Sequence, residues 1–85
     1  MISQLHLLYS CPTGFEPYLR RLEACVAAFG RMLEVTRIDD AQTLVPRAAF
    51  VSATQPTLLL LDGGDLIAEA IGDLSAHELR CFFAS

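Results

Sequence analysis

The fold is decided by one stretch in the second half of the chain, Ala53-Thr54-Gln55-Pro56-Thr57-Leu58-Leu59-Leu60-Leu61-Asp62-Gly63-Gly64-Asp65-Leu66-Ile67-Ala68-Glu69-Ala70-Ile71-Gly72-Asp73-Leu74-Ser75. Its first apolar run, Thr57 to Leu61, has no polar break, which is typical of a strand covered on both faces of a sheet. The next three residues, Asp62, Gly63 and Gly64, adopt positive φ at low steric cost, so we expect a tight turn. The apolar runs on either side of this turn therefore predict an antiparallel hairpin.

A final amphipathic helix is predicted after the motif Gly72-Asp73-Leu74-Ser75. Ser75 and Glu78 have the spacing of a capping box, in which each side chain accepts a hydrogen bond from the backbone amide of the other residue. We expect Asp73, which follows Gly72, to accept hydrogen bonds from backbone amides at the helix start. The apolar contacts of this helix are expected to be Leu74, Leu79, Phe82 and Phe83.

The first half of the chain predicts a strand, a loop and an amphipathic helix. Leu5 to Tyr9 is a short apolar run, and the breaker cluster Ser10 to Gly14 follows it. From Glu16 onward apolar residues recur at helical spacing until Gly30, which is expected to end the helix. These residues are Leu19, Leu22, Cys25, Val26 and Phe29.

The start of this helix has two possible positions in the sequence. Thr13 with Glu16 has the spacing of a capping box, whereas Cys11 followed by a proline places that proline at the favoured first helical position. Pro17 favours a start within Thr13–Phe15, because the proline then stays in the first turn, where it removes no helical hydrogen bond.

The remaining segments complete a single α/β domain over residues 1–85. Met32 to Ile38 is rich in β-branched residues and predicts a second strand. Ala41 to Phe50 predicts a short, irregular helix, and Ser52 to Gln55 predicts a loop. The expected order is β-α-β-α-β-β-α, with parallel crossovers early and an antiparallel hairpin late. That order predicts a four-stranded mixed sheet with helices on both faces.

The composition indicates a surface that binds another protein. The 85 residues are 53% hydrophobic, with a mean hydropathy of +0.42. A domain of this size cannot hide so much apolar surface in one small core, so we expect an interface with a partner or with another copy of the chain. The net charge is −4 and the six basic residues are scattered arginines, which argues against nucleic acid and anionic membranes as partners.

The sequence predicts a cytoplasmic protein without a cofactor or a metal. Met1 to Gln4 lacks the layout of a signal peptide, and no apolar run approaches the ~18 residues of a membrane span. The three cysteines form no Cys-x-x-Cys pair, so we expect reduced thiols and no zinc knuckle. His6 and His77 are not spaced as a metal-binding pair.

The segment Leu7 to Gly14 resembles the loop after the first strand of glutaredoxins, and the order of elements is similar to the thioredoxin fold. In that fold this loop carries the reactive cysteine and a cis-proline precedes the third strand. The resemblance therefore implies a thiol site at Cys11 with a cis peptide bond before Pro56. The redox motif is incomplete, because Gly14 stands where the second cysteine is expected. In an alternative alignment both thiols are replaced, by Gly14 and Pro17.

A closer resemblance links the chain to the KaiB family, which comprises circadian-clock proteins and the KaiB-like sensor domains that precede some histidine kinases. The matching segments, in the family's order and at similar separations, are Leu8-Tyr9, Ile38-Asp39, Thr54-x-Pro56-Thr57-Leu58 and Ile71-Gly72-Asp73-Leu74-Ser75. The resemblance implies a non-enzymatic adaptor of circadian or stress regulation. Such an adaptor docks on a ring-shaped KaiC-type ATPase and competes with or recruits other signalling proteins.

KaiB is also metamorphic, which gives the hairpin turn a further meaning. The family is known for switching between a tetrameric ground fold, which lacks this late hairpin, and a thioredoxin-like monomer that binds the partner. The turn that is proline-rich in clock KaiB is Asp62-Gly63-Gly64 here, and these residues stabilise a hairpin locally. We therefore expect the chain to rest mainly in the thioredoxin-like state. The residues expected to shape the fold or its switching are Pro56, Asp62, Gly63, Gly64, Gly72 and Asp73.

An alternative function from a different class is that of a monothiol oxidoreductase. Cys11 is the nucleophile in this hypothesis, because a thiol at a helix N-terminus has its thiolate stabilised by the unpaired amides. Pro56 then borders the substrate. A third hypothesis is a degenerate fold that only dimerises, and a homo-oligomer is possible. The lack of a second thiol and the motif Gly72-Asp73-Leu74-Ser75 favour the adaptor.

Overall fold

The computed structural model of the chain describes residues 5–38 and 51–84. Its elements are, in chain order, β1 (Leu5–Ser10), α1 (Glu16–Ala27), a short 3-10 turn η1 (Gly30–Met32), β2 (Leu33–Arg37), β3 (Thr57–Asp62), β4 (Asp65–Ile71) and α2 (Ala76–Phe83). The four predicted strands and the predicted first and last helices are thus confirmed. The helix predicted over Ala41 to Phe50 lies outside the described residues.

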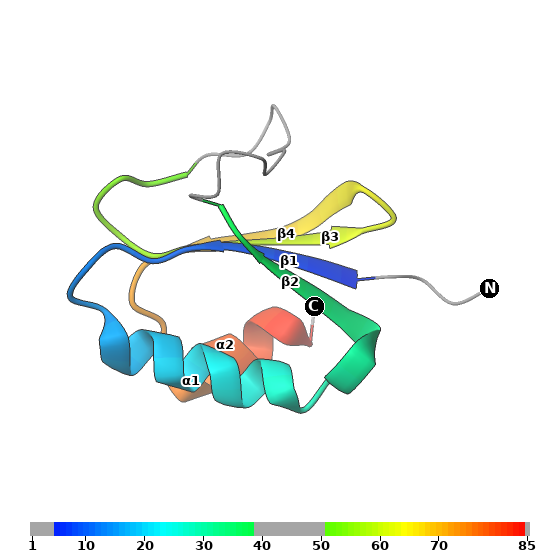
Figure 1. Cartoon of the computed structure of the whole chain (residues 1–85), viewed down its shortest axis with the longest axis horizontal. Coiled ribbons are helices and arrows are strands. Elements are labelled where there is room, and N and C mark those ends of the chain that lie inside the picture. Colours follow the sequence, from blue (N-terminus) through cyan, green and yellow to red (C-terminus); the bar gives the residue numbers. More distant parts are fainter. Residues whose placement is uncertain (1–4, 39–50, 85) are drawn as a thin grey trace.

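The four strands form one mixed sheet in the order β2-β1-β3-β4. β1 and β2 run parallel and are joined through α1, whereas β3 runs antiparallel to both β1 and β4. Both α1 and α2 lie against the same face of the sheet (Figure 1). The prediction of helices on both faces is therefore met on one face, and the segment expected to supply the other helix is outside the described residues. The architecture is a small α/β fold.

β3 is buried on both of its faces, as its unbroken apolar run predicts. Thr57 to Leu61 are all buried, and neither Leu58 nor Leu59 exposes any surface. Because side chains alternate along a strand, Leu58 and Leu60 point to one face of the sheet and Leu59 points to the other. The strand thus contributes to two separate apolar clusters.

The larger cluster lies between the sheet and the helices, and its buried members are Leu7, Tyr18, Leu22, Leu33, Leu58, Leu60, Leu79 and Phe82. Just beyond the end of α1, Phe29 packs against Phe83 of α2, with the ring centroids 5.2 Å apart. The smaller cluster joins Leu8 with Leu59 and Leu61, and the partly buried residues packed against it are Ile38, Val51 and Leu66. Apolar side chains therefore stabilise the sheet from both faces.

Of the two starts that the sequence leaves open for α1, neither the capping box of Thr13 with Glu16 nor a first helical residue at Pro12 is found. The helix begins at Glu16, and its N-cap residue is Phe15, with no side-chain capping bond. Gly14 has a φ of +102°, so a sharp turn separates Thr13 from the first helical amides. Pro17 lies in the first turn, where its missing N–H costs no hydrogen bond, as the sequence predicts.

The hairpin is confirmed, and its loop has two residues. Asp62 at the end of β3 lies opposite Asp65 at the start of β4. Gly63 and Gly64 between them have φ values of +60° and +96°. Two successive residues with positive φ give a turn whose twist matches the twist of the flanking strands, which is why glycine is favoured at both positions.

The capping box of α2 is also confirmed. Ser75 Oγ accepts a hydrogen bond from the Glu78 N–H at 3.2 Å, and Glu78 Oε1 accepts one from the Ser75 N–H at 3.0 Å. Hydrogen bonding to the carboxyl from the Ser75 backbone N–H, and secondarily from the Ser75 side chain, lowers the pKa of Glu78 from its usual value. The ionised carboxylate is therefore favoured by folding.

Replacing Gly64 with Ala is expected to lower the free energy of unfolding by about 1–2 kcal/mol, because an L side chain is strained at positive φ. No described atom lies within 4 Å of the position of an added Cβ, so the loss comes from the backbone and not from a clash. Urea denaturation of the wild type, Gly64→Ala and Gly63→Asn measures the change in the free energy of unfolding. Asn tolerates the left-handed conformation of Gly63, so this control should lose less; an equal loss in both variants contradicts the turn geometry.

Removing the Glu78 carboxylate is expected to lower Tm at neutral pH but not in acid. A depressed pKa in the folded state means that the stabilisation is present above the unfolded pKa of about 4.3 and is lost as the pH falls through the folded value. Tm measured against pH for the wild type and Glu78→Ala should therefore converge below this range. Glu78→Gln keeps an acceptor oxygen without titrating, so its Tm relative to Glu78→Ala should not depend on pH. A Tm difference between the wild type and Glu78→Ala that does not change with pH contradicts the prediction.

Candidate functional site

β2 and β4 form the two edges of the described sheet. An edge strand presents its outer backbone to any chain that approaches the sheet, and such edges are used to add a strand from a partner. Val35 of β2 is paired in register with Leu7, so it faces the helices, yet it is 39% exposed. Met32, at the entrance to β2, is 64% exposed. Two large apolar side chains are therefore exposed at or next to the β2 edge.

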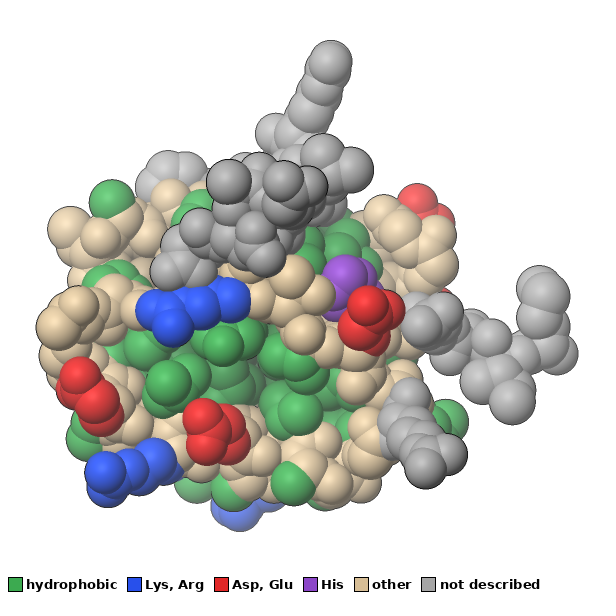
Figure 2. Space-filling view, viewed as in Figure 1, with side chains coloured by type: hydrophobic (Ala, Val, Ile, Leu, Met, Phe, Trp, Pro, Cys, Tyr) green, Lys and Arg blue, Asp and Glu red, His purple; other side chains and the backbone are tan. Residues whose placement is uncertain are grey.

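An apolar hollow of ≈ 320 Å³ lies between this edge and α1, lined by Tyr9, Leu19, Leu22, Glu23, Val26, Ala27 and Val35. We call it the β2–α1 hollow. Figure 2 shows apolar side chains gathered at the centre of the face on which β2 and α1 are seen, with acidic and basic side chains around them. An apolar centre within a polar rim is the usual anatomy of a protein–protein interface.

A second apolar surface is a groove of ≈ 500 Å³ between the two helices, lined by Arg21, Ala24, Cys25, Ala28, Phe29, Ala76, Arg80, Phe83 and Ala84. Its lining is mainly apolar, with two phenylalanines, four alanines and a cysteine beside the two arginines. The two surfaces account for part of the apolar composition that the core does not absorb.

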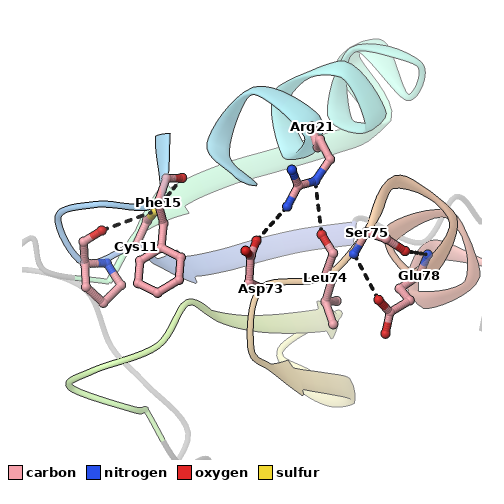
Figure 3. A network of polar contacts seen from close by, with 8 residues as sticks. Cys11, Phe15, Arg21, Asp73, Leu74, Ser75 and Glu78 are labelled. Carbon is pink, nitrogen blue, oxygen red and sulfur yellow. Dashed lines mark hydrogen bonds and ion pairs between the residues drawn. The ribbon is translucent and has the colours of Figure 1, made fainter. Parts of the chain in front are cut away.

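Cys11 lies in the loop between β1 and α1, five residues before the first helical residue. Its Sγ donates to the carbonyl oxygens of Pro12 and Phe15, at 3.8 Å each, and the side chain is half-buried (Figure 3). The oxidoreductase hypothesis requires a thiol at a helix N-terminus, and the Cys11 thiol does not lie there. Carbonyl acceptors stabilise the protonated thiol, whereas amide donors stabilise the thiolate.

The electrostatic surroundings of Cys11 also favour the protonated thiol. Burial raises the pKa of the thiol above its ordinary value, Arg37 opposes this rise, and the carboxylates of Glu16 and Asp73 add to it. A raised pKa leaves a smaller fraction of thiolate at neutral pH, and the thiolate is the nucleophilic form. Cys11 therefore has the environment of a structural thiol.

The predicted cis peptide bond before Pro56 is wrong, since the described peptide bonds are all trans. The loop before Pro56 is turned by side chains instead. Ser52 Oγ accepts hydrogen bonds from the N–H groups of Thr54 and Gln55, at 3.2 and 3.1 Å, and Thr57 Oγ1 accepts one from the Ser52 N–H at 3.1 Å. These bonds direct the chain into β3 without a cis bond.

The sheet register brings several of the predicted residues to one end. Ser10 pairs with Thr57, and Thr57 pairs with Ile71, so the loops that carry Cys11, Pro56 and Gly72 emerge from the same end of the sheet. The Gly72 N–H donates to the Pro56 carbonyl at 2.9 Å. The turn residues Asp62, Gly63 and Gly64 lie at the opposite end of β3.

The prediction that Asp73 caps the last helix is wrong. Asp73 Oδ1 pairs with Arg21 Nη2 at 2.6 Å, while Arg21 Nε donates to the Leu74 carbonyl at 3.1 Å (Figure 3). Ser75 occupies the N-cap position instead. Gly72, with a φ of +123°, turns the chain so that Asp73 faces α1. The motif thus ties the β4–α2 connection to α1.

Arg21 is the residue of this site that sequence reasoning missed. The helical pattern places it opposite the apolar face, which indicates a solvated side chain, yet its side chain is only 32% exposed. Arg21 lies at the boundary between the polar and apolar faces of the helix. Whether such a residue meets solvent or a neighbouring loop depends on how the helix is rotated about its axis. A lone arginine on a polar helix face carries no sequence signal for a partner 52 residues away.

Tyr18 is a buried group next to the same loop. Its side chain is 1% exposed, and among the described residues its Oη has no hydrogen-bond partner. Burial raises the pKa of the hydroxyl, and Cys11 and Asp73 raise it further against the opposing effect of Arg21. Tyr18 therefore stays neutral and acts as a core residue.

Comparison of the chain with models of protein families, with curated proteins and with solved structures finds no match. Within residues 5–38 and 51–84, no helix is long and apolar enough to cross a membrane. The same residues contain no group of three or more His, Cys, Asp or Glu side chains able to hold a metal ion.

Cys11 is expected to react slowly with iodoacetamide, because its raised pKa keeps the thiol protonated. In the reduced protein its alkylation at pH 8 should be slower than that of the exposed Cys81, and its rate should keep rising above pH ~8.5, the pKa of an ordinary thiol. Mass spectrometry of each cysteine-containing peptide measures both rates. Fast alkylation of Cys11 that has already levelled off below pH 8 contradicts this account.

Proposed function

We propose that the chain is a non-enzymatic protein-binding module of the KaiB type, which docks on a KaiC-type ATPase or on a related signalling partner such as a histidine-kinase system. It acts in the cytoplasm, in circadian or stress regulation. The observation that carries this proposal is the β2–α1 hollow, an apolar surface at a sheet edge with a charged rim. Val35 is the exposed apolar residue on the strand that borders it.

The sheet supports the thioredoxin-like assignment within this proposal. Its first two strands are parallel and are joined by a helix on one face, and an antiparallel hairpin follows late in the chain. The Gly63-Gly64 turn, with both φ values positive, supports a resting state in which this hairpin is formed. The resting state is then the one that binds the partner, and binding needs no prior change of fold.

The motif Gly72-Asp73-Leu74-Ser75 supports the proposal through its place in the fold. Asp73 and the Leu74 carbonyl hold the β4–α2 connection against α1 through Arg21. α1 forms one wall of the β2–α1 hollow. The motif therefore positions the docking surface without contacting the partner itself.

The monothiol oxidoreductase is the weaker proposal. Cys11 and Pro56 lie at the same end of the sheet, as that hypothesis requires. Against it, the peptide bond before Pro56 is trans, and the Cys11 thiol faces carbonyl oxygens and has a raised pKa. Protein binding accounts for the exposed apolar side chains around the β2–α1 hollow, whereas a redox role for Cys11 does not.

Docking through the β2–α1 hollow is tested by placing a charge in it. The full chain and its Val35→Lys variant are titrated against the purified KaiC-type ATPase ring of the source organism, in the presence of ATP, and Kd is measured by biolayer interferometry. A lysine buried at the centre of an interface should weaken binding roughly tenfold or more, because the ammonium loses its hydration.

Ile67→Lys is the matched control for this experiment. Ile67 is 48% exposed on β4, the opposite edge of the sheet, so it carries the same change at a similar exposure. Its Kd should stay within about twofold of the wild type, since rim and remote positions contribute little. Absence of binding by the wild-type chain, or a loss in Ile67→Lys that equals the loss in Val35→Lys, overturns the proposed docking surface.

A further inference from the structure

The exposed face of α2 carries two metal-ligating side chains that the proposed function does not use. His77 and Cys81 are four residues apart, so both project from the same face of the helix. Both are exposed, and His77 Nε2 lies 3.6 Å from Cys81 Sγ. A histidine and a cysteine at this spacing match none of the cysteine or histidine pairs expected of a metal site from sequence, so the pair is recognised only in the structure.

The distance between these two atoms fits a tetrahedral metal site. Zinc binds thiolate sulfur at about 2.3 Å and imidazole nitrogen at about 2.0–2.1 Å, usually with tetrahedral geometry. Two bonds of these lengths at the tetrahedral angle place the sulfur and the nitrogen about 3.5–3.6 Å apart. The observed separation of 3.6 Å between His77 Nε2 and Cys81 Sγ matches this spacing.

The chemistry of the pair selects the kind of ion. A thiolate and a neutral imidazole are borderline-soft donors that suit Zn²⁺ and its substitute Co²⁺, and they do not suit Mg²⁺ or Ca²⁺. Cys81 lies in the last turn of α2, where the helix dipole favours a positive charge. On coordination the thiol gives its proton to water, and the sulfur binds the metal as a thiolate.

We propose that His77 and Cys81 are half of a four-donor Zn²⁺ site, which is completed by the same two residues of a second copy of the chain. One copy supplies two donors, and a two-fold axis beside α2 presents an identical pair. Glu78 and Arg80 flank the pair on its two sides of the helix. In a parallel two-fold packing of α2 helices, the acidic side of one copy therefore faces the basic side of the other.

Cobalt is the probe that reports both the donors and the stoichiometry. Co²⁺ is titrated into the reduced full chain without chelator, thiolate-to-cobalt charge transfer is followed in the near ultraviolet, and the molar mass is measured by light scattering. The site predicts the charge-transfer band, saturation at about one ion per two chains, a doubled mass and displacement of Co²⁺ by Zn²⁺.

Variants distinguish this site from other thiols and imidazoles in the chain. His77→Ala and Cys81→Ser change exposed side chains, and each should weaken Co²⁺ binding roughly tenfold or more and prevent dimerisation by the metal. Cys25→Ser and His6→Gln remove one residue of each type elsewhere and should bind as the wild type does. Circular dichroism checks that all four variants are folded.

Three results would overturn the proposal. One is the absence of a charge-transfer band in the wild-type chain. Another is a band that persists unchanged in both His77→Ala and Cys81→Ser. The third is saturation at one ion per chain with an unchanged mass, which excludes completion by a second copy. None of these results depends on the KaiC-type partner, so the metal site and the docking surface are tested separately.

Discussion

The burial of β3 on both faces is the constraint on which the rest of the structure depends. Full burial of one leucine side chain contributes about 1.5–3 kcal/mol, and β3 buries four of them, Leu58 to Leu61. The ion pair of Arg21 with Asp73, whose side chains are 32% and 56% exposed, contributes at most about 1 kcal/mol. Apolar burial therefore stabilises the fold, while the ion pair fixes where the β4–α2 connection lies. Each face of β3 needs its own apolar cover, and this requirement places both helices on one side of the sheet and the Leu8 cluster on the other.

At the end of the sheet where the loops gather, polar groups of the loops bond to other groups of the protein. The Cys11 thiol donates to two carbonyl groups, the Gly72 amide donates to Pro56, and Arg21 joins α1 to Asp73. In these contacts the polar groups of the loops are bonded within the protein. On the described part of the chain, the surfaces left available for function include the β2–α1 hollow, the groove between the helices and the outer face of α2. The β2–α1 hollow and the outer face of α2 lie on different elements, which is compatible with a module that binds a large partner at one surface and a metal-linked copy of itself at another.

The sequence predicts the fold best where one residue pattern has only one structural explanation. The unbroken run of β3, the Gly63-Gly64 turn and the capping box of Ser75 all depend on neighbouring residues, and all are confirmed. The predictions that are wrong depend on contacts between distant segments. Asp73 meets a side chain of another helix, and the cis bond before Pro56 is replaced by a serine-based turn that no spacing rule specifies. For the same reason the apolar composition predicts an interface but gives it no location on the sheet or the helices.

The most direct test of this account is to measure backbone chemical shifts and cross-strand nuclear Overhauser effects by NMR on the full chain in solution. The account predicts β-type secondary shifts over Thr57–Asp62 and Asp65–Ile71, together with close contacts between the paired residues Leu58 and Ala70. Helical shifts extending across Leu58 to Ile71 contradict it, because they place the buried strand and its hairpin in a different fold.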